Sequence, residues 1–279
     1  MIYEERSRFL MVHPIERLRY VARASGGDQR MLVRETAGAI RGLQFEPAGL
    51  VIACRRIVER HPTSGPLWWF CSSLLTSAQP FNAAHELAFE IEHDPTPDHL
   101  FDALPDEATV CVVGWPDLIG DAVMRRGDIR VLAIDADDEG SSFVRRLQRA
   151  DIDAEVVPPG GAAAAAVSAD LVLIEAMATG PDDTLVASSS RAAASVAYCS
   201  EVPVWLVAGR GRRLPVPLFA TMVERVADVR VPWLAMAEPM PLALAGFVVG
   251  PDGVFDAATP GVLAAECGMA HELVRPSPM

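Results

Sequence analysis

"ADLVLIEAMATGPDDTLVASSSRAAASVAYCSEVPVWLVAG", residues 169–209, holds two short apolar runs separated by a helical pattern. The runs, Leu171–Ile174 and Val204–Val207, are short and fully apolar, which is typical of strands that are buried on both faces. Ser188–Cys199 lies between them and has a helical pattern. A strand, a crossover helix and a second strand in this order predict a parallel sheet covered by helices.

The same alternation fills the second part of the chain. Four further apolar runs are expected to be strands: Thr109–Val113, Arg130–Ile134, Ala154–Val157 and Phe247–Val249. Ser141–Ala150 and the alanine run Ala162–Ala166 are expected to be helical, because alanine is the strongest helix former. These patterns predict an α/β fold with a Rossmann-like, mainly parallel sheet flanked by helices.

The first part of the chain has helical spacing instead. Five helices are expected there: one from Pro14, one capped by Asp28, one from Pro47, one within residues 64–78, and one capped by Asn82 that runs towards His93. Residues 64–78, "SGPLWWFCSSLLTSA", are apolar around most of the helix, which predicts burial on several sides or a subunit contact. The stretch 93–108 is rich in Pro and Asp and marks a boundary between a helical domain, 1–105, and the α/β domain, 106–279.

Composition excludes several classes of function. The 279 residues carry a net charge of -13, which argues against a nucleic-acid surface, because that surface depends on Lys and Arg. The five cysteines and six histidines form no pattern typical of a disulfide framework, and no metal site or cofactor is expected. No apolar run reaches the ~20 residues of a membrane span, and the first residues lack the pattern of a secretory signal. A reduced, cytoplasmic protein is expected.

Glu175 follows an expected buried strand directly. Ligands of open parallel sheets bind at the carboxyl ends of the strands, so this carboxylate is expected at the edge where chemistry occurs. It has two interpretations. It could bind backbone N–H groups or a nearby arginine, or it could be a general acid/base whose pKa is raised by the apolar strands beneath it.

Two other clusters are expected at the same edge. Arg210, Arg212 and Arg213 follow another strand and are either solvated loop charges or an anion site. Ser188–Ser190 begin a helix, where they could cap it or direct N–H groups at an anion. The chain has no Gly-x-Gly-x-x-Gly, Walker or Gly-x-Ser-x-Gly motif at a suitable position.

Several stretches together resemble one superfamily. It contains the alpha, beta and delta regulatory subunits of eukaryotic translation initiation factor 2B, and the methylthioribose-1-phosphate and ribose-1,5-bisphosphate isomerases. Residues 169–209 are similar to the family's Gly-Ala-Asp strand, its turn, its helix near Gly-Thr and its "VPV" strand. Residues 247–273, "FVVGPDGVFDAATPGVLAAECGMAHEL", are similar to its Asn-Pro-x-Phe-Asp-x-Thr-Pro segment and its closing Thr-Glu-x-Gly. The resemblance implies a helical domain followed by a Rossmann-like domain, a homodimer and a phosphorylated small-molecule ligand.

The resemblance also assigns positions to the site. Glu175, or its neighbour Ala176, falls at the isomerases' catalytic aspartate, and Gly114–Trp115 falls where they have a cysteine. Ser189–Ser190 replace Gly-Thr, and Asp256 matches the aspartate of the Phe-Asp segment. The isomerases' thiol and cationic phosphate contacts are missing from their usual positions. The stretch "VVGWPDLIGDAV", residues 112–123, looks more like the non-catalytic subunits, where a Gly-x-Ser-type turn replaces the cysteine.

Three hypotheses follow. The favoured one is a protein of this scaffold that has lost the isomerase residues. It either binds a small molecule, such as a sugar phosphate or a nucleotide, or acts in assembly. The alternative is a divergent aldose–ketose sugar-phosphate isomerase that uses Glu175 as its acid/base, with Asp256 and Arg212 or Arg213 orienting the substrate. In the third, the chain is a subunit of a larger complex, in which the apolar segment "PLWWFCSSLL", residues 66–75, is an interface.

Overall fold

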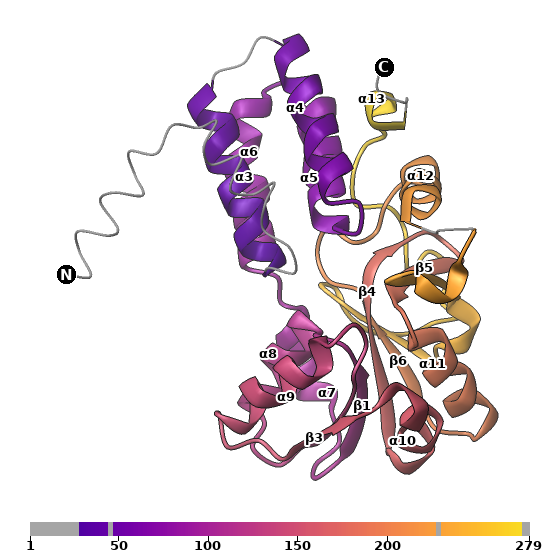
Figure 1. Ribbon diagram of the computed structural model, residues 1–279. Coiled ribbons are helices and arrows are strands. Elements are labelled where there is room, and N and C mark those ends of the chain that lie inside the picture. The colour runs from indigo at the N-terminus through magenta and orange to yellow at the C-terminus, as the bar shows by residue number, and fades with distance from the viewer. Residues whose placement is uncertain (1–27, 44–46, 227–229, 275–279) are drawn as a thin grey trace.

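The computed structural model describes residues 28–43, 47–226 and 230–274. The helix expected from Pro14 lies outside these residues. In Figure 1 the first helices of the chain stand together at one end, and the sheet with its covering helices forms the rest.

The helical part contains the helices α3 to α7. Their bounds are Gln29–Leu43, Pro47–Arg60, Gly65–Thr76, Pro80–Glu92 and Thr96–Ala103. Asp28 caps α3 as predicted, because its Oδ1 accepts a hydrogen bond from the Arg30 backbone N–H at 2.8 Å. The fifth prediction is wrong in detail. α6 begins at Pro80, which suits the first helical position, so Asn82 lies inside the helix.

Helix α5 lies in the core of the chain. Leu67, Trp68, Phe70 and Leu74 are all fully buried, and they pack within a cluster to which helices α3 to α6, the C-terminal helices and the second half of the central strand contribute. The hypothesis that this segment is an interface with another protein is therefore wrong. A helix that is apolar all round is here enclosed by its own chain.

The sheet confirms the predicted parallel architecture. Strands β1, β2, β3 and β6 have the predicted bounds, Thr109–Val113, Arg130–Ile134, Ala154–Val157 and Val204–Val207, while β8 runs one residue further, Phe247–Gly250. The strand order is β3-β2-β1-β4-β6-β8-β9, in which the last strand, Gly253–Asp256, is antiparallel to β8. Helices α8, Asp117–Arg125, and α9, Glu139–Gln148, cover one face. Helices α10, Ala162–Ser168, and α11, Ser190–Cys199, cover the other.

The central strand β4, Leu171–Thr179, is longer than predicted. Its first part pairs in parallel with β6 as far as Glu175, which is opposite Val207. Its second part pairs antiparallel with β5, Asp183–Ala187, and β5 in turn pairs with β7, Ala237–Pro241. Glu175 is therefore the last residue of the parallel pairing and not the end of the strand.

The C-terminal segment returns to the helical part. Helix α12, Val216–Val226, and the short α13, His271–Val274, pack into the same cluster as helices α3 to α6. The Ser72 hydroxyl donates to the Gly268 carbonyl at 2.6 Å and accepts from the Ala270 N–H at 3.1 Å. Among the described residues, none of the helices has the length and apolar character that crossing a bilayer requires.

Candidate functional site

Glu175 is held on both of its carboxylate oxygens. Its Oε2 accepts hydrogen bonds from the backbone N–H groups of Leu118 and Ile119, at 2.8 and 3.1 Å, which belong to the first turn of α8. Its Oε1 accepts from the Arg212 guanidinium at 2.8 Å. The two side chains are only 9% and 6% exposed. A negative charge at a helix N-terminus and a buried arginine partner both stabilise the ionised carboxylate.

The Arg212 guanidinium also binds two acceptors within the protein. Besides Glu175, its guanidinium donates to the Ala176 carbonyl on the same strand. The loop that carries it follows β6, so this ion pair ties the end of β6 to β4 and, through Glu175, to α8. The pair performs the first of the two roles considered for Glu175, since it binds backbone N–H groups and an arginine.

Asp117 is a second carboxyl group at this position and was not singled out from the sequence. It is the first residue of α8, beyond the carboxyl end of β1. Burial raises its pKa to about 6, and the negative charge of Glu175 acts in the same direction, while the positive charge of Arg212 opposes them. The signal was a carboxylate directly after Pro116 at a strand end, which is the beginning of a helix.

Little space is left around these groups. A cavity of about 10 Å³ is lined by Asp117, Leu118 and Arg212 together with residues of the helical part, among them Gln29 and Asp94. This volume corresponds to about one water molecule. Binding sites for small ligands typically measure about 300 Å³ or more. Among the described residues, this cavity beside Asp117 and Arg212 is therefore too small for a sugar phosphate or a nucleotide.

The loop Gly209–Leu214 closes the site from the side of the helical part. The Arg210 N–H donates to Asp94 Oδ2 at 2.8 Å, in the connection between α6 and α7. Gly209 needs to lack a side chain, because a Cβ there would lie 2.4 Å from both Asp94 Oδ2 and a Leu118 methyl group. The helical part, the β6 loop and α8 therefore meet in van der Waals contact.

Arg213 belongs to a separate cluster. Its guanidinium pairs with Glu266 at 2.5 Å and with Asp252 at 2.8 Å. Burial raises the pKa of Glu266, although the nearby charge of Arg213 opposes this shift. Arg212 and Arg213 thus point to different carboxylates, and the anion site predicted for the arginines is satisfied by acidic side chains of the same chain.

The N-terminus of α11 is also bound by a carboxylate of the protein. Ser189 has a left-handed backbone with φ of 75°, and Ser190 is buried as the first helical residue. Glu238, on β7, accepts a hydrogen bond from the Arg191 N–H at 3.1 Å. A carboxylate of the protein therefore stands at the helix N-terminus where a bound anion was expected. The α11 helix and α8 cover opposite faces of the sheet, and the serines follow β5, whose Val186 pairs with Ala176 beside Glu175.

Gly114 and Trp115 lie between β1 and α8. Trp115 packs on Phe143 of α9, with ring centroids 6.0 Å apart, and the Arg146 guanidinium lies 5.7 Å from its centroid. Gly114 has a φ of 65° and forms the turn between β1 and α8.

Asp256 is at the opposite edge of the sheet, because it pairs with Phe247 at the amino end of β8. The expectation that it lies at the ligand edge is wrong. After β8 the chain reverses and runs antiparallel as β9, so Asp256 lies at the end of the sheet where β8 begins.

The cysteines and the possible metal ligands show no reactive arrangement. Burial raises the pKa of Cys111 inside β1 to about 12, so its thiol stays protonated at neutral pH. Within the described ranges, no three histidine, cysteine or carboxylate side chains lie close enough to hold a metal ion.

Comparison with solved structures identifies the fold. The translation initiation factor eIF-2B of Pyrococcus horikoshii OT3 superposes with a TM-score of 0.72 at 12% identity, over 87% of this chain and 96% of that one. The eIF2B beta subunit of Chaetomium thermophilum has a TM-score of 0.65 at 13% identity, over 93% and 91% of the two chains. A chain of the tetrameric eIF2B beta2-delta2 complex from the same organism has a TM-score of 0.66 at 13% identity, over 88% and 90%.

At the level of sequence alone, no family model and no curated protein matches the chain. The structural match nevertheless covers nearly the whole of both chains, including the helical part. The chain therefore has the fold of the eIF2B subunits, as the resemblance of its sequence implied.

Proposed function

We propose that this protein is a non-catalytic, eIF2B-like protein that acts as an assembly component and forms a homodimer. The observation that carries the proposal is the state of Glu175, whose carboxylate is bound by Arg212 and by the first turn of α8. An acid/base for sugar isomerisation needs a carboxylate that reaches the substrate. Here both oxygens face the protein.

Two further features support the loss of the isomerase function. The cavity at this position has room for about one water molecule, whereas a sugar phosphate needs many times that volume. Glu238 occupies the N-terminus of α11 that would otherwise attract a phosphate. An acidic side chain at that place repels a phosphate dianion.

An assembly role is supported by the relatives of the fold. One of the solved structures is a tetramer of beta and delta subunits. We infer that this chain also associates through its α/β part, and that its first assembly is a homodimer. Light scattering tests this. A mass near twice the 30.0 kDa of the chain supports it, and a concentration-independent monomer would contradict it.

A small-molecule ligand is the second candidate, favoured by one recess. An opening of about 320 Å³ lies beside α8 and is lined by Arg30, Asp98, Asp121 and Arg125 among others. Its two arginines are 29% and 50% exposed, but each is paired with an aspartate of the recess. A phosphorylated ligand would have to displace those carboxylates.

The two candidates separate in one experiment. Thermal shift assays with sugar phosphates and nucleotides should give no stabilisation if the protein acts only in assembly. A ligand-induced rise of the melting temperature that is absent in Arg125→Gln would support small-molecule binding in the recess. Turnover of any sugar phosphate that is lost in Glu175→Gln, with the melting temperature unchanged, would support the isomerase alternative instead.

A further inference from the structure

A cluster of apolar side chains is exposed beside β7. Trp233, Leu234 and Met236 are 82%, 74% and 63% exposed. They are consecutive or nearly so, in the short 3-10 turn Pro232–Leu234 and the residues that lead into β7. We call these three residues the 233–236 patch. Single exposed apolar residues are ordinary on a protein surface, but three large ones together usually mark a contact with a partner.

The patch is anchored to the sheet. The Met236 carbonyl accepts a hydrogen bond from the Ser188 N–H at 3.0 Å, next to the start of α11. The β7 strand that follows is paired only with β5 among the described strands, so it forms an edge. Pro239 and Pro241 lie on this edge strand and lack the N–H donors that an added strand would need. A partner must therefore bind the side chains and not extend the sheet.

The size and composition of the patch suit the centre of an interface. Trp233 alone exposes about 200 Å² of side chain, against the roughly 800 Å² that each partner of a stable complex buries. Tryptophan is the residue type most enriched among those that dominate binding, and methionine is also enriched at interfaces. The patch thus supplies a well-anchored apolar centre, with the rest of the area to come from its surroundings.

The charge pattern favours a second copy of the same chain. The stretch 231–237 has no charged residue, in a chain whose net charge is -13. In a two-fold contact each residue near the axis meets its own copy, so a charged residue there would meet an equal charge. Two acidic molecules can approach each other most easily where the charge is absent.

We propose that the 233–236 patch is the surface through which two copies of this chain associate. This inference rests on the homodimer of the proposed function and assigns its contact. The side chain of Trp233 of each copy packs against the patch of the other, so its indole leaves water when the dimer forms.

Sedimentation equilibrium tests the assignment, with Trp233→Ala and Met236→Glu compared with wild type. We expect Trp233→Ala to raise the dissociation constant of the dimer about 30-fold, as is typical of a residue that dominates an interface. Met236→Glu places two like charges near the axis and should give a monomer at all concentrations reached. Far-ultraviolet circular dichroism should not change in either variant, because both side chains are exposed.

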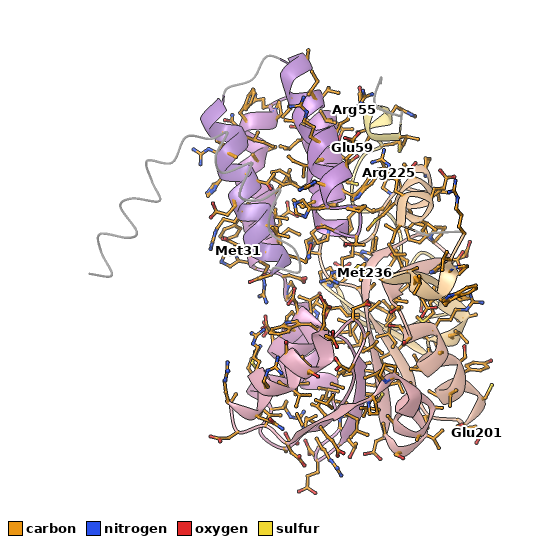
Figure 2. All side chains as sticks on the ribbon, in the orientation of Figure 1. Met31, Arg55, Glu59, Glu201, Arg225 and Met236 are labelled. Atoms are coloured by element: carbon orange, nitrogen blue, oxygen red, sulfur yellow. The ribbon has the colours of Figure 1, made fainter. Side chains whose placement is uncertain are left out.

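Tyr198→Ala is the matched control. Tyr198 is 61% exposed and lies at the end of α11 that is remote from Met236, next to Glu201. Figure 2 shows Glu201 and Met236 at separate places on the α/β part. The helix is 10 residues long, which separates its ends by about 15 Å. The control should dimerise as wild type does.

Fluorescence gives a second measurement. Trp68 and Trp69 are buried, and Trp233 is the most exposed of the five tryptophans. Dilution of the dimer should therefore shift the emission to longer wavelength in wild type and not in Trp233→Phe.

The outcomes are distinct. A wild-type protein that is monomeric at every concentration overturns both this inference and the proposed homodimer. If the dimer persists unchanged in Trp233→Ala and Met236→Glu, only the assignment of the patch is overturned. The same conclusion follows if Tyr198→Ala weakens the dimer as much as those two substitutions do.

Discussion

At the scale of single residues, Glu175 and Arg212 determine how the sheet and α8 are joined. A carboxylate buried at the end of parallel pairing would destabilise the fold if it were unpaired. Its three partners, two backbone N–H groups and one guanidinium, remove that cost. The same contacts leave neither oxygen free for a substrate.

Asp117 gives a prediction about pH. Its pKa rises from 3.8 unfolded to about 6 folded, so the folded protein binds more protons between these values and its stability falls as pH rises through this window. Asp117→Asn removes the effect. The free energy of unfolding of the variant, measured relative to that of wild type, should therefore rise by about 2 kcal/mol from pH 4.5 to pH 7.5. Urea unfolding at both pH values measures this, and a difference between the two proteins that stays constant with pH would contradict it.

At the scale of elements, the junction between α5 and β4 is a close contact. Gly65, the first residue of α5, faces the second half of β4, and a Cβ there would lie 2.2 Å from the Met177 carbonyl oxygen. Backbone atoms on both sides prevent an easy shift. The second half of β4 thus depends on a glycine more than a hundred residues earlier.

Gly65→Ala is therefore expected to lower the free energy of unfolding by about 2 kcal/mol, as overpacking does in a close-packed core. Gly127→Ala is the matched control, because a Cβ at Gly127 meets nothing within 4 Å. It should change stability by less than about 0.5 kcal/mol. Equal effects of the two substitutions in urea unfolding would show that the contact is not tight.

The strands were predictable because each is short and mainly apolar. Val204–Val207 and Arg130–Ile134 have this form and were found at the predicted bounds. Residues 175–179 do not have this form, because Glu175 and two alanines follow the apolar run and indicate the end of a strand. Their strand conformation comes from the antiparallel hairpin with β5, whose short connection Gly180–Asp182 was not interpreted as a hairpin turn.

The edge of the sheet that carries the site was predictable, but the partners at that edge were not. Glu175 and Arg212 were both placed there from the strand pattern, yet their pairing needs the loop after β6 to fold onto β4. Asp256 was misplaced because the β8–β9 turn reverses the chain after Gly250. Glu238 was outside every motif, although it caps α11 across the β5–β7 pairing.

At the scale of the whole molecule, the helical and α/β parts share one apolar cluster. Val33, Leu67 and Phe70 of the helical part pack in the same cluster as Phe219 and Leu273 from the end of the chain. A boundary near residue 105 therefore separates two patterns of sequence, and we propose that it does not separate two independently folding units.

The shared cluster predicts a single unfolding transition. Calorimetry of the full chain should give one peak, and fluorescence and circular dichroism should follow the same curve. Residues 1–105 alone should not fold stably, since they would expose the face that α12 and α13 cover. Two separate transitions, or a folded 1–105 fragment, would contradict this.

The central claim is that Glu175 is a structural partner of Arg212 and α8. Its most direct test is a double-mutant cycle in which Glu175→Gln, Arg212→Met and the double variant are unfolded in urea. The exposed pair Glu155 and Arg130, 3.1 Å apart, serves as control and should couple by less than about 1 kcal/mol. We predict that Glu175→Gln alone costs about 3 kcal/mol, because it leaves a buried charge unpaired, and that the pair couples by at least about 2 kcal/mol. A Glu175→Gln variant as stable as wild type, with no coupling to Arg212, would contradict the account.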